Sequence, residues 1–497
     1  TSSTSFTKNY RLRMYVDENY NPQDDGGDLV FTIRVNVYGK TGDPMRFTVA
    51  ETLLNGVGSN GAINTSDPDQ TFITGTDPNN YIWYSGKLWR AVSIDPDDNS
   101  VKLVTQWNIS AVPYTPLNQA AFEGSYMEQW LNDTSVDGFL GNLRNYENFI
   151  KMDSVWNATT TTQNFGSITE LPETILVTDA VGLLNIYEYQ VSSSGTDYSN
   201  GYLNNGLIWW TLTPFNGRYI HYVRGDGFSP GAVESTNAYG VRPSINLKSS
   251  ARITSGDGTE NNPYRLEGDN DTDLNGTLLN TRYSGEYIQF GTGENTLYRI
   301  VSHETNGLTK ITSAEPLKSS GTFITSAFGS SSSEVNYSSS NTIGSFLNGD
   351  YLTSYVGDNY SSMIEPSTTW YLGTVGSGTS YRLAKYSSIT GNDLTTSTTD
   401  AQVGLLRLGE LMVGQFERDA VKGGSTSTKL TTFYWTLTPY STYYVRNVQS
   451  NGIPSEQYSG SPTQSLAVRP AMNLKSSVII TGGDGTKNNP FTIALNS

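Results

Sequence analysis

Hydrophobic and polar residues alternate with a period of two along much of the chain, a pattern that is typical of β-strands. The alternation first appears over residues 10–16 and again over 29–37, on either side of a turn-rich loop. We therefore predict a short N-terminal β segment, a hairpin within residues 1–42. An isolated hairpin is marginally stable, so these strands either pack on the following chain or act as donor strands in a neighbouring subunit.

The same alternation predicts strands over 81–92 and 101–105, which are joined by the turn-forming sequence at 95–99. Because Asp, Pro and Asn dominate that turn, the two segments are expected to form a pair of hairpins. Later in the chain the pattern predicts three more strands: 207–212, 219–224 and 241–247.

Only two segments of the first half have the spacing of a helix. Residues 125–131 place Tyr126, Trp130 and Leu131 on one face. Residues 178–188 form the second candidate, with Asp179 at the N-cap or in the first turn. The pattern therefore predicts an α+β chain that is mostly β.

A long sequence block occurs twice, in the same order and at near-equal spacing. Both copies contain Trp-Thr-Leu-Thr-Pro, Val-Arg-Pro, Asn-Leu-Lys-Ser-Ser, Gly-Asp-Gly-Thr and Asn-Asn-Pro. The repeat is much longer than the ~20–50 residues of solenoid units, so we interpret it as two tandem modules, over 43–268 and 278–497. The repeated framework residues are these: Trp210, Arg242 and Pro243 in the first module, and Trp435, Arg469 and Pro470 in the second.

Residues 269–277 are predicted to link the modules, because the run from Asp269 to Asp273 is acidic and polar. Its Asp-x-Asp-x-Asp spacing also suggests a calcium loop. An EF-hand loop then requires Gly at its sixth position and Glu at its twelfth, where this chain has Leu274 and Asn280. A solvated linker is therefore favoured.

The order of these elements resembles a C-type-lectin-like fold: a hairpin, two short helices, and strands with Trp-Thr-Leu-Thr-Pro that end in Val-Arg-Pro. It is most similar to the branch shared by formylglycine-generating enzymes and the variable ligand-binding proteins of diversity-generating retroelements. The resemblance covers both modules and implies two tandem C-type-lectin-like modules behind the N-terminal β segment. Many surface proteins of Gram-positive bacteria carry repeats of this style, which implies an extracellular, cell-surface location.

The chain lacks the functional residues of two groups of proteins with this fold, the formylglycine-generating enzymes and the sugar-binding C-type lectins. Formylglycine-generating enzymes use active-site Cys, and the sequence contains none. Sugar-binding C-type lectins hold calcium with Glu-Pro-Asn and Trp-Asn-Asp, neither of which occurs. We therefore predict no catalytic residue, no cofactor and no metal site. Bound calcium at the turns that contain Asp257 and Asp484 is a minority alternative to plain turn formation.

Composition narrows the choice of partners. The net charge is −16 over 497 residues, which opposes binding to phosphate backbones and to anionic membrane surfaces. With 36% hydrophobic and only 16% charged residues, the chain is too apolar to be disordered. No apolar run approaches the roughly 18 residues that would predict a membrane-spanning helix.

The residues between the two fixed motifs differ from one module to the other, and related proteins place variable ligand contacts there. Aromatic residues on strands and loops supply rigid contact area for recognition, although they can equally well just cover strands. The candidate ligand-binding residues are Tyr219, Tyr222, Phe228, Tyr239, Tyr443, Tyr444 and Tyr458. In contrast, Arg242 and Arg469 are predicted to be buried against backbone carbonyls as structural supports.

We rank three functions. The first is a non-enzymatic structural subunit of a surface filament, a homopolymer joined through its N-terminal β segment. The second is an adhesin that binds glycan or protein through the Tyr-rich loops. The third and weakest is a hydrolase or oxidase, because His221 and His303 are not accompanied by a nucleophile motif.

Overall fold

The computed structural model describes residues 46–496, except for gaps at 116, 136–137, 194–197, 229–231, 270–273, 304–305, 373–397, 408–409, 412–432 and 449–453. The chain from Arg46 onward forms one compact unit. The predicted β segment at 1–42 lies outside the described residues.

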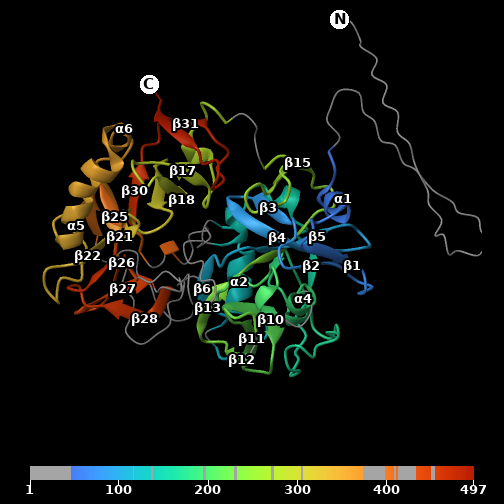
Figure 1. Ribbon diagram of the computed structural model, residues 1–497. Coiled ribbons are helices and arrows are strands. Elements are labelled where there is room, and N and C mark those ends of the chain that lie inside the picture. Colours follow the sequence, from blue (N-terminus) through green and yellow to red (C-terminus); the bar gives the residue numbers. More distant parts are fainter. Residues whose placement is uncertain are drawn as a thin grey trace, which may run out of the picture. The chain divides into compact units, whose positions relative to one another are not determined.

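The first module contains many short strands and few helices (Figure 1). Its elements are α1 (Val49–Leu54), β1 (Gly61–Asn64), β2 (Thr71–Gly75), β3 (Tyr81–Tyr84), β4 (Lys87–Ile94), β5 (Val101–Thr105), β6 (Ser110–Pro113), α2 (Tyr126–Asn132), α3 (Tyr146–Phe149), β7 (Ser154–Asn157), β8 (Leu176–Asp179), β9 (Val181–Gly182), α4 (Ile186–Val191), β10 (Trp209–Pro214), β11 (Tyr219–Val223), β12 (Ala232–Glu234), β13 (Ala238–Val241), β14 (Ser244–Leu247), β15 (Ile253–Ser255) and β16 (Tyr264–Leu266), with 3-10 turns η1 (Leu140–Asn142) and η2 (Tyr198–Asn200).

The second module follows the same plan. Its described elements are the 3-10 turn η3 (Leu279–Thr281), β17 (Tyr287–Gln289), β18 (Leu297–His303), β19 (Thr309–Ser313), β20 (Lys318–Ser319), β21 (Thr322–Phe323), β22 (Thr325–Ala327), α5 (Thr342–Leu347), the π-helix η4 (Leu352–Val356), α6 (Asp358–Ser361), β23 (Thr368–Tyr371), β24 (Thr398–Ala401), β25 (Val403–Leu405), β26 (Tyr434–Ser441), β27 (Tyr444–Val448), β28 (Pro454–Gly460), β29 (Ser465–Ala467), β30 (Pro470–Leu474), β31 (Val478–Gly482) and β32 (Thr492–Leu495).

Strand order is the same in the two modules. The path β3-β4-β5-β14-β9 in the first module corresponds to β17-β18-β19-β30-β25 in the second. A further sheet has the order β12-β11-β10-β13-β6 in the first module and β28-β27-β26-β29-β22 in the second. The sequence repeat is therefore a repeat of topology, and the prediction of a mostly β, α+β chain is confirmed.

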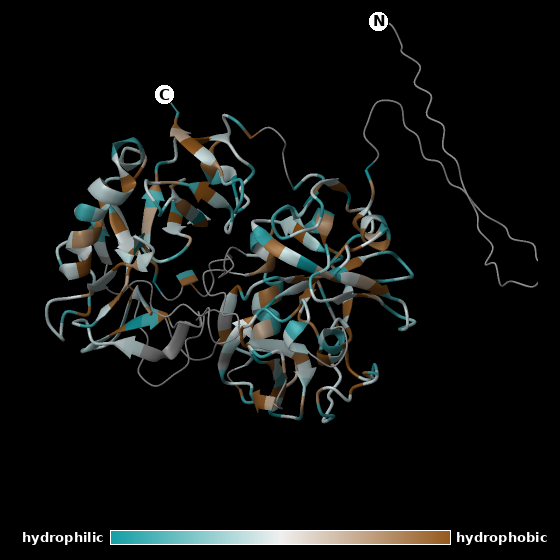
Figure 2. Ribbon diagram, in the orientation of Figure 1, coloured by the Kyte–Doolittle hydropathy of each residue, from teal (hydrophilic) through white to brown (hydrophobic). Residues whose placement is uncertain are grey.

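Each module buries its own hydrophobic core. One cluster contains residues from Val49 to Leu266 and the other contains residues from Leu274 to Ile493. Figure 2 shows hydrophobic residues in the strands and helices of both modules and hydrophilic residues in many of the turns. This distribution is the one that the period-two alternation predicts for sheets with a buried face.

The first predicted helix is confirmed, and the second is wrong over most of its length. Helix α2 begins after Ser125, whose side chain accepts a hydrogen bond from the backbone N–H of Glu128. Residues 178–182 instead form the end of β8 and all of β9, so Asp179 is a strand residue and not an N-cap. The helix begins only after Asn185, which forms a capping box with Glu188.

The prediction of a solvated linker over 269–277 is wrong at Asp269 and Leu274, which are buried, whereas Asn275 and Gly276 are exposed. Asp269 is 3% exposed and Leu274 is 9% exposed, while residues 270–273 lie outside the described part of the chain. The backbone N–H of Ser85 points at the Asp269 carboxylate. The acidic residue therefore serves packing at the junction of the modules.

Candidate functional site

The repeated arginines are buried and bonded to backbone carbonyls, as predicted. Nε of Arg242 donates to the carbonyl oxygen of Thr105 at 2.9 Å, and Nε of Arg469 donates to that of Ser313 at 2.8 Å. The neighbouring prolines have their own partners: the carbonyl oxygens of Pro243 and Pro470 accept from Thr105 N and Thr312 Oγ1. The repeated tryptophans donate their indole N–H in the same way, Trp210 to the carbonyl of Val112 and Trp435 to that of Ser326.

The predicted aromatic ligand residues do not form one surface in the first module. The rings of Tyr222 and Tyr239 lie 5.0 Å apart, and Tyr239 lies 5.0 Å from Trp210, so these two tyrosines pack on the core. Phe228 contacts a separate group, with its ring 6.0 Å from Tyr198. Tyr219 is partly exposed at the start of β11.

In the second module, two predicted residues are exposed. Tyr443 is 57% exposed and Tyr444 is 44% exposed. The ring of Tyr444 lies 6.5 Å from that of Tyr440, at the β26–β27 turn. The side chain of Tyr458 lies outside the described residues. Tyr443 and Tyr444 therefore remain available for contact with a partner.

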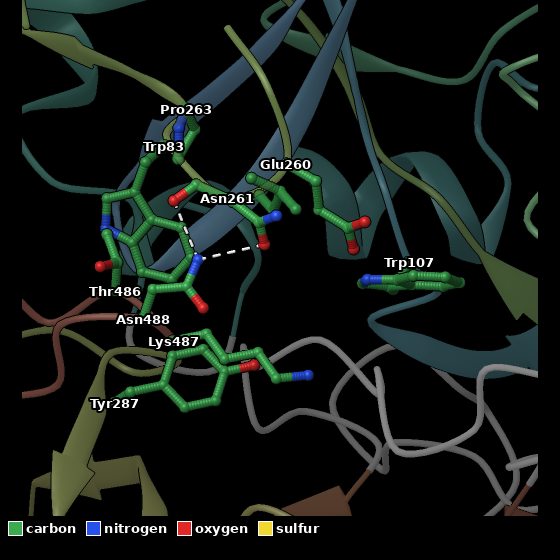
Figure 3. Close-up of a pocket in the computed structure, with 10 residues that line it drawn as sticks. Trp83, Trp107, Glu260, Asn261, Pro263, Tyr287, Thr486, Lys487 and Asn488 are labelled. Atoms are coloured by element: carbon green, nitrogen blue, oxygen red, sulfur yellow. Dashed lines mark hydrogen bonds between the residues drawn. The ribbon is translucent and has the colours of Figure 1, made fainter. Parts of the chain in front are cut away.

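A pocket that sequence reasoning missed lies where the two modules meet (Figure 3). We call it the junction pocket, and it has a volume of about 260 Å³. Three aromatic side chains line it together with amides, a hydroxyl and one charge of each sign. Its lining residues are Trp83, Leu88, Trp107, Glu260, Asn261, Pro263, Tyr287, Thr486, Lys487 and Asn488.

Strand edges of both modules position the aromatic rings. Trp83 belongs to β3 and Tyr287 begins β17, and their ring centroids are 6.2 Å apart. Trp107 follows β5 and packs with Leu207. Figure 3 shows the side chains of Lys487 and Glu260 pointing toward Trp107. The pocket therefore combines aromatic surfaces with both a carboxylate and an ammonium group.

The polar wall of the junction pocket is formed by two equivalent turns, one at Asp257 and one at Asp484. In each Gly-Asp-Gly-Thr turn the Asp carboxylate accepts from the following Thr, both from its N–H at 3.0 Å and from its Oγ1 at 2.7 Å. These hydrogen bonds also lower the pKa of Asp257. The turns meet at Asn488, whose Nδ2 donates to the carbonyl oxygen of Asn261 at 2.9 Å. The wall is therefore a fixed polar surface.

The backbones of the two modules approach closely beside the pocket. A Cβ added to Gly86 would lie 2.5 Å from the carbonyl oxygen of Ser284, and one added to Gly285 would lie 2.2 Å from that of Gly86. Both glycines have positive φ. Arg299 also contributes, because its Nη2 donates to the carbonyl oxygens of Gly86 and Gly285. The absence of side chains at these two positions lets the modules meet.

Asp269 makes the stability of this junction depend on pH. Burial, together with the charge of Glu286, raises the pKa of Asp269 to about 6, although Arg144 and Arg265 oppose the rise. The folded protein therefore binds this proton more tightly than the unfolded chain, and the contribution to stability falls as pH rises from about 4 to about 6. Asp269→Asn should remove this fall, so that the variant is more stable than the wild type at pH 7.5 by about 2–3 kcal/mol.

Paired thermal melts at pH 4.5 and 7.5 check this expectation. The difference in Tm between the two pH values should be smaller for Asp269→Asn, while the exposed Asp97→Asn serves as a control and should match the wild type. An unchanged pH difference in Asp269→Asn would show that the carboxylate is ionised in the folded protein throughout this range.

The sequence contains a signal for the junction pocket, but only when the two modules are compared at equivalent positions. Glu260 and Lys487 occupy the same position of the Gly-Thr-x-Asn-Asn-Pro motif with opposite charges. Strand pairing places Trp83 opposite Leu88 and Gln289 opposite Leu297, so Gln289 replaces Trp83 in the second module. The pocket is thus lined by residues that differ between modules on a shared framework.

No group of three or more His, Asp or Glu side chains that could hold a metal ion occurs within the described ranges. Among the same residues, none of the helices is long and apolar enough to cross a membrane. No protein-family model, no curated protein and no solved structure matches this chain.

Proposed function

We propose that this chain is a non-enzymatic, extracellular recognition protein that binds a neutral saccharide in the junction pocket. Two C-type-lectin-like modules would form the scaffold. The observation that carries the proposal is the combination of Trp83, Trp107 and Tyr287 with amide groups in one concave site. These three aromatic side chains are only 2–4% exposed, so they offer a sugar ring a small apolar contact. The hydroxyls of the sugar match amides, which both donate and accept.

The charges of the pocket favour a neutral ligand. A cationic ligand would face the Lys487 ammonium group, and an anionic ligand would face the Glu260 carboxylate. A hydroxyl group can accept a hydrogen bond from the first and donate one to the second. A polyhydroxylated neutral ring therefore offers each side chain a hydrogen bond beside the partners that it already has in the folded chain.

We therefore rank the function of an adhesin above that of a filament subunit. Polymerisation depends on residues 1–42, which lie outside the described residues, and it remains a prediction from sequence. The binding proposal instead rests on described side chains. It also moves the predicted site from the Tyr-rich loops to the junction of the modules.

The full chain should bind neutral glycans on a printed array, and Trp107→Ala should weaken the binding at least about tenfold. Trp107 is 4% exposed, so near-ultraviolet circular dichroism must first show that the variant is folded. Glu260→Ala provides a second test, because Glu260 is exposed and its truncation leaves the cores intact. Isothermal titration with each glycan that binds gives the affinities.

The matched control is the double variant Tyr443→Ala, Tyr444→Ala, which removes the exposed rings at the alternative site. Saccharide affinity should be unchanged in this control. Loss of binding in the Tyr variant, with normal binding in Trp107→Ala and Glu260→Ala, would return the site to the loops. If the wild type binds none of the glycans on the array, the proposal is wrong.

A further inference from the structure

A second pocket lies next to the junction pocket. We call it the side pocket, and it has a volume of about 210 Å³. It is lined by Glu294, Asn295, Leu297, Ser313, Ala314, Glu315, Pro316, Lys318 and Lys487. Lys487 lines both pockets. The two hollows are therefore neighbours that share one side chain.

A continuous apolar cluster joins the two pockets. Trp83, Leu88 and Tyr287 from the junction pocket pack in one cluster with Leu297 and Ala314 from the side pocket. Apart from Leu297 the members of this cluster are at most 9% exposed, so the cluster fixes the two pockets side by side from within.

The side pocket occupies a position in the second module that corresponds to part of the junction pocket in the first. Gln106 N–H donates to the carbonyl of Leu88, and Ala314 N–H donates to that of Leu297. Glu315 therefore stands where the first module has Trp107. With Trp107, the junction pocket is suited to apolar contact with a sugar ring. With Glu315, the side pocket is suited to hydrogen bonding with hydroxyl groups.

The polar wall of the side pocket is held in place before any ligand binds. Asn295 brackets Lys318 with two backbone hydrogen bonds, each 2.8 Å long. The Lys318 ammonium group donates to Glu315 at 2.5 Å, and Glu294 accepts from the backbone of Gly321 at 3.0 Å. A fixed wall lowers the entropy that is lost when a ligand binds.

We propose that the two pockets are adjacent subsites of one oligosaccharide site, with a ring against the aromatic side chains of the junction pocket and the next ring hydrogen-bonded in the side pocket. This inference rests on the proposed function. Each pocket is smaller than the ~300–1,000 Å³ of a typical drug-sized ligand site, so each accommodates a small unit. The ligand class is therefore a neutral oligosaccharide of at least two units.

The test compares chain lengths. The probes are the methyl glycosides of glucose, galactose, mannose and N-acetylglucosamine, together with the β-1,4-linked disaccharides and trisaccharides of glucose and of N-acetylglucosamine, titrated into the full chain. Affinity should rise at least about tenfold from monosaccharide to disaccharide in a series that binds, as expected when a second set of contacts is added without a second loss of rigid-body freedom.

Glu315→Ala identifies where that gain arises. The variant should lose most of the gain and keep the affinity of the wild type for the monosaccharide, because Glu315 does not line the junction pocket. The matched control is Glu234→Ala. Glu234 is also an exposed Glu paired with a basic side chain, Arg218 at 3.1 Å, and it lines neither pocket.

The outcomes separate the inference from the proposed function. Monosaccharide binding without a gain for longer chains, or a gain that persists in Glu315→Ala, overturns the two-subsite inference and leaves the proposed function standing. If none of these sugars binds and the glycan array is also negative, both fail.

Discussion

Glu188→Gln should lower the free energy of unfolding of the first module by about 3–5 kcal/mol. The Glu188 carboxylate is 2% exposed and is paired with the Lys102 ammonium group, which also lies 5.1 Å from the Trp156 ring centre. The substitution preserves the shape of the side chain and an oxygen that can accept the capping hydrogen bond. It removes the charge, so the Lys102 side chain, which is only 11% exposed, is left without its counterion. Denaturant unfolding, followed by Trp fluorescence, measures the loss.

The duplication supplies the controls. Lys310 and Glu410 form the equivalent pair at 2.6 Å, and Glu410→Gln should destabilise the second module to a similar extent. The exposed pair of Lys151 and Asp98 should contribute less than about 1 kcal/mol when Asp98→Asn breaks it. The double variant Lys102→Met, Glu188→Gln should recover most of the stability, because no buried charge is left unpaired. A loss below about 1 kcal/mol in Glu188→Gln would mean that the pair is solvated.

The ion pair illustrates which part of the fold could be predicted from sequence. Lys102 and Glu188 recur in the second module as Lys310 and Glu410, so the alignment of the two copies indicates which positions belong to the shared framework. Strand positions could also be predicted, because alternation of apolar residues is a local property of the chain. The same strand order in both modules follows from those shared positions.

The helix predicted over 178–188 shows where local reasoning fails. Val181 and Gly182 pair with Ile245 and Ser244 of β14, and a Cβ on Gly182 would lie 2.4 Å from the Trp156 ring. These contacts are made with residues far away in the sequence, and no local pattern indicates them. The capping box at Asn185 is local, and it marks the true start of the helix.

The candidate site could not be predicted by the same route. Its lining side chains come from strands β3, β4 and β17, from the segment after β5 and from two equivalent turns of different modules, so the pocket exists only because the modules meet. The tyrosines that were predicted to bind ligand include Tyr222 and Tyr239, which pack against the core and stay partly exposed. Aromatic composition alone does not distinguish these two uses.

Comparison of equivalent positions shows how one duplicated scaffold comes to have an asymmetric pocket. Framework residues that hold strands together are the same in both modules, whereas Trp107 and Glu315 differ at one equivalent position, as do Glu260 and Lys487. Glu260 and Lys487, which occupy equivalent positions, place opposite charges in the junction pocket. Divergence of the two copies where they meet therefore makes the junction pocket asymmetric, in addition to differences within the cores such as Trp89 against Tyr298.

Arg242→Ala should be the second severe substitution, with a loss of about 3–5 kcal/mol. The guanidinium group donates to the carbonyls of Thr105 and Leu203, at 2.9 and 2.6 Å, and lies 4.7 Å from the ring centre of Trp209. Truncation leaves buried carbonyls without these donors and a cavity beside the ring. Urea unfolding of the purified variant measures the effect.

If this arginine is a structural support, the equivalent substitution in the second module should cause a similar loss of stability, and a conservative substitution should cause a smaller one. Arg469→Ala should be about as damaging, because its guanidinium donates to the carbonyls of Ser313 and Ala314 at 2.8 and 3.0 Å. Arg242→Lys should recover part of the loss, since a Lys ammonium group is a single point of charge that replaces a planar fork of donors. The folded Arg242→Lys variant should bind saccharide as tightly as the wild type. Loss of binding at full stability would instead place Arg242 in the recognition of an anionic ligand.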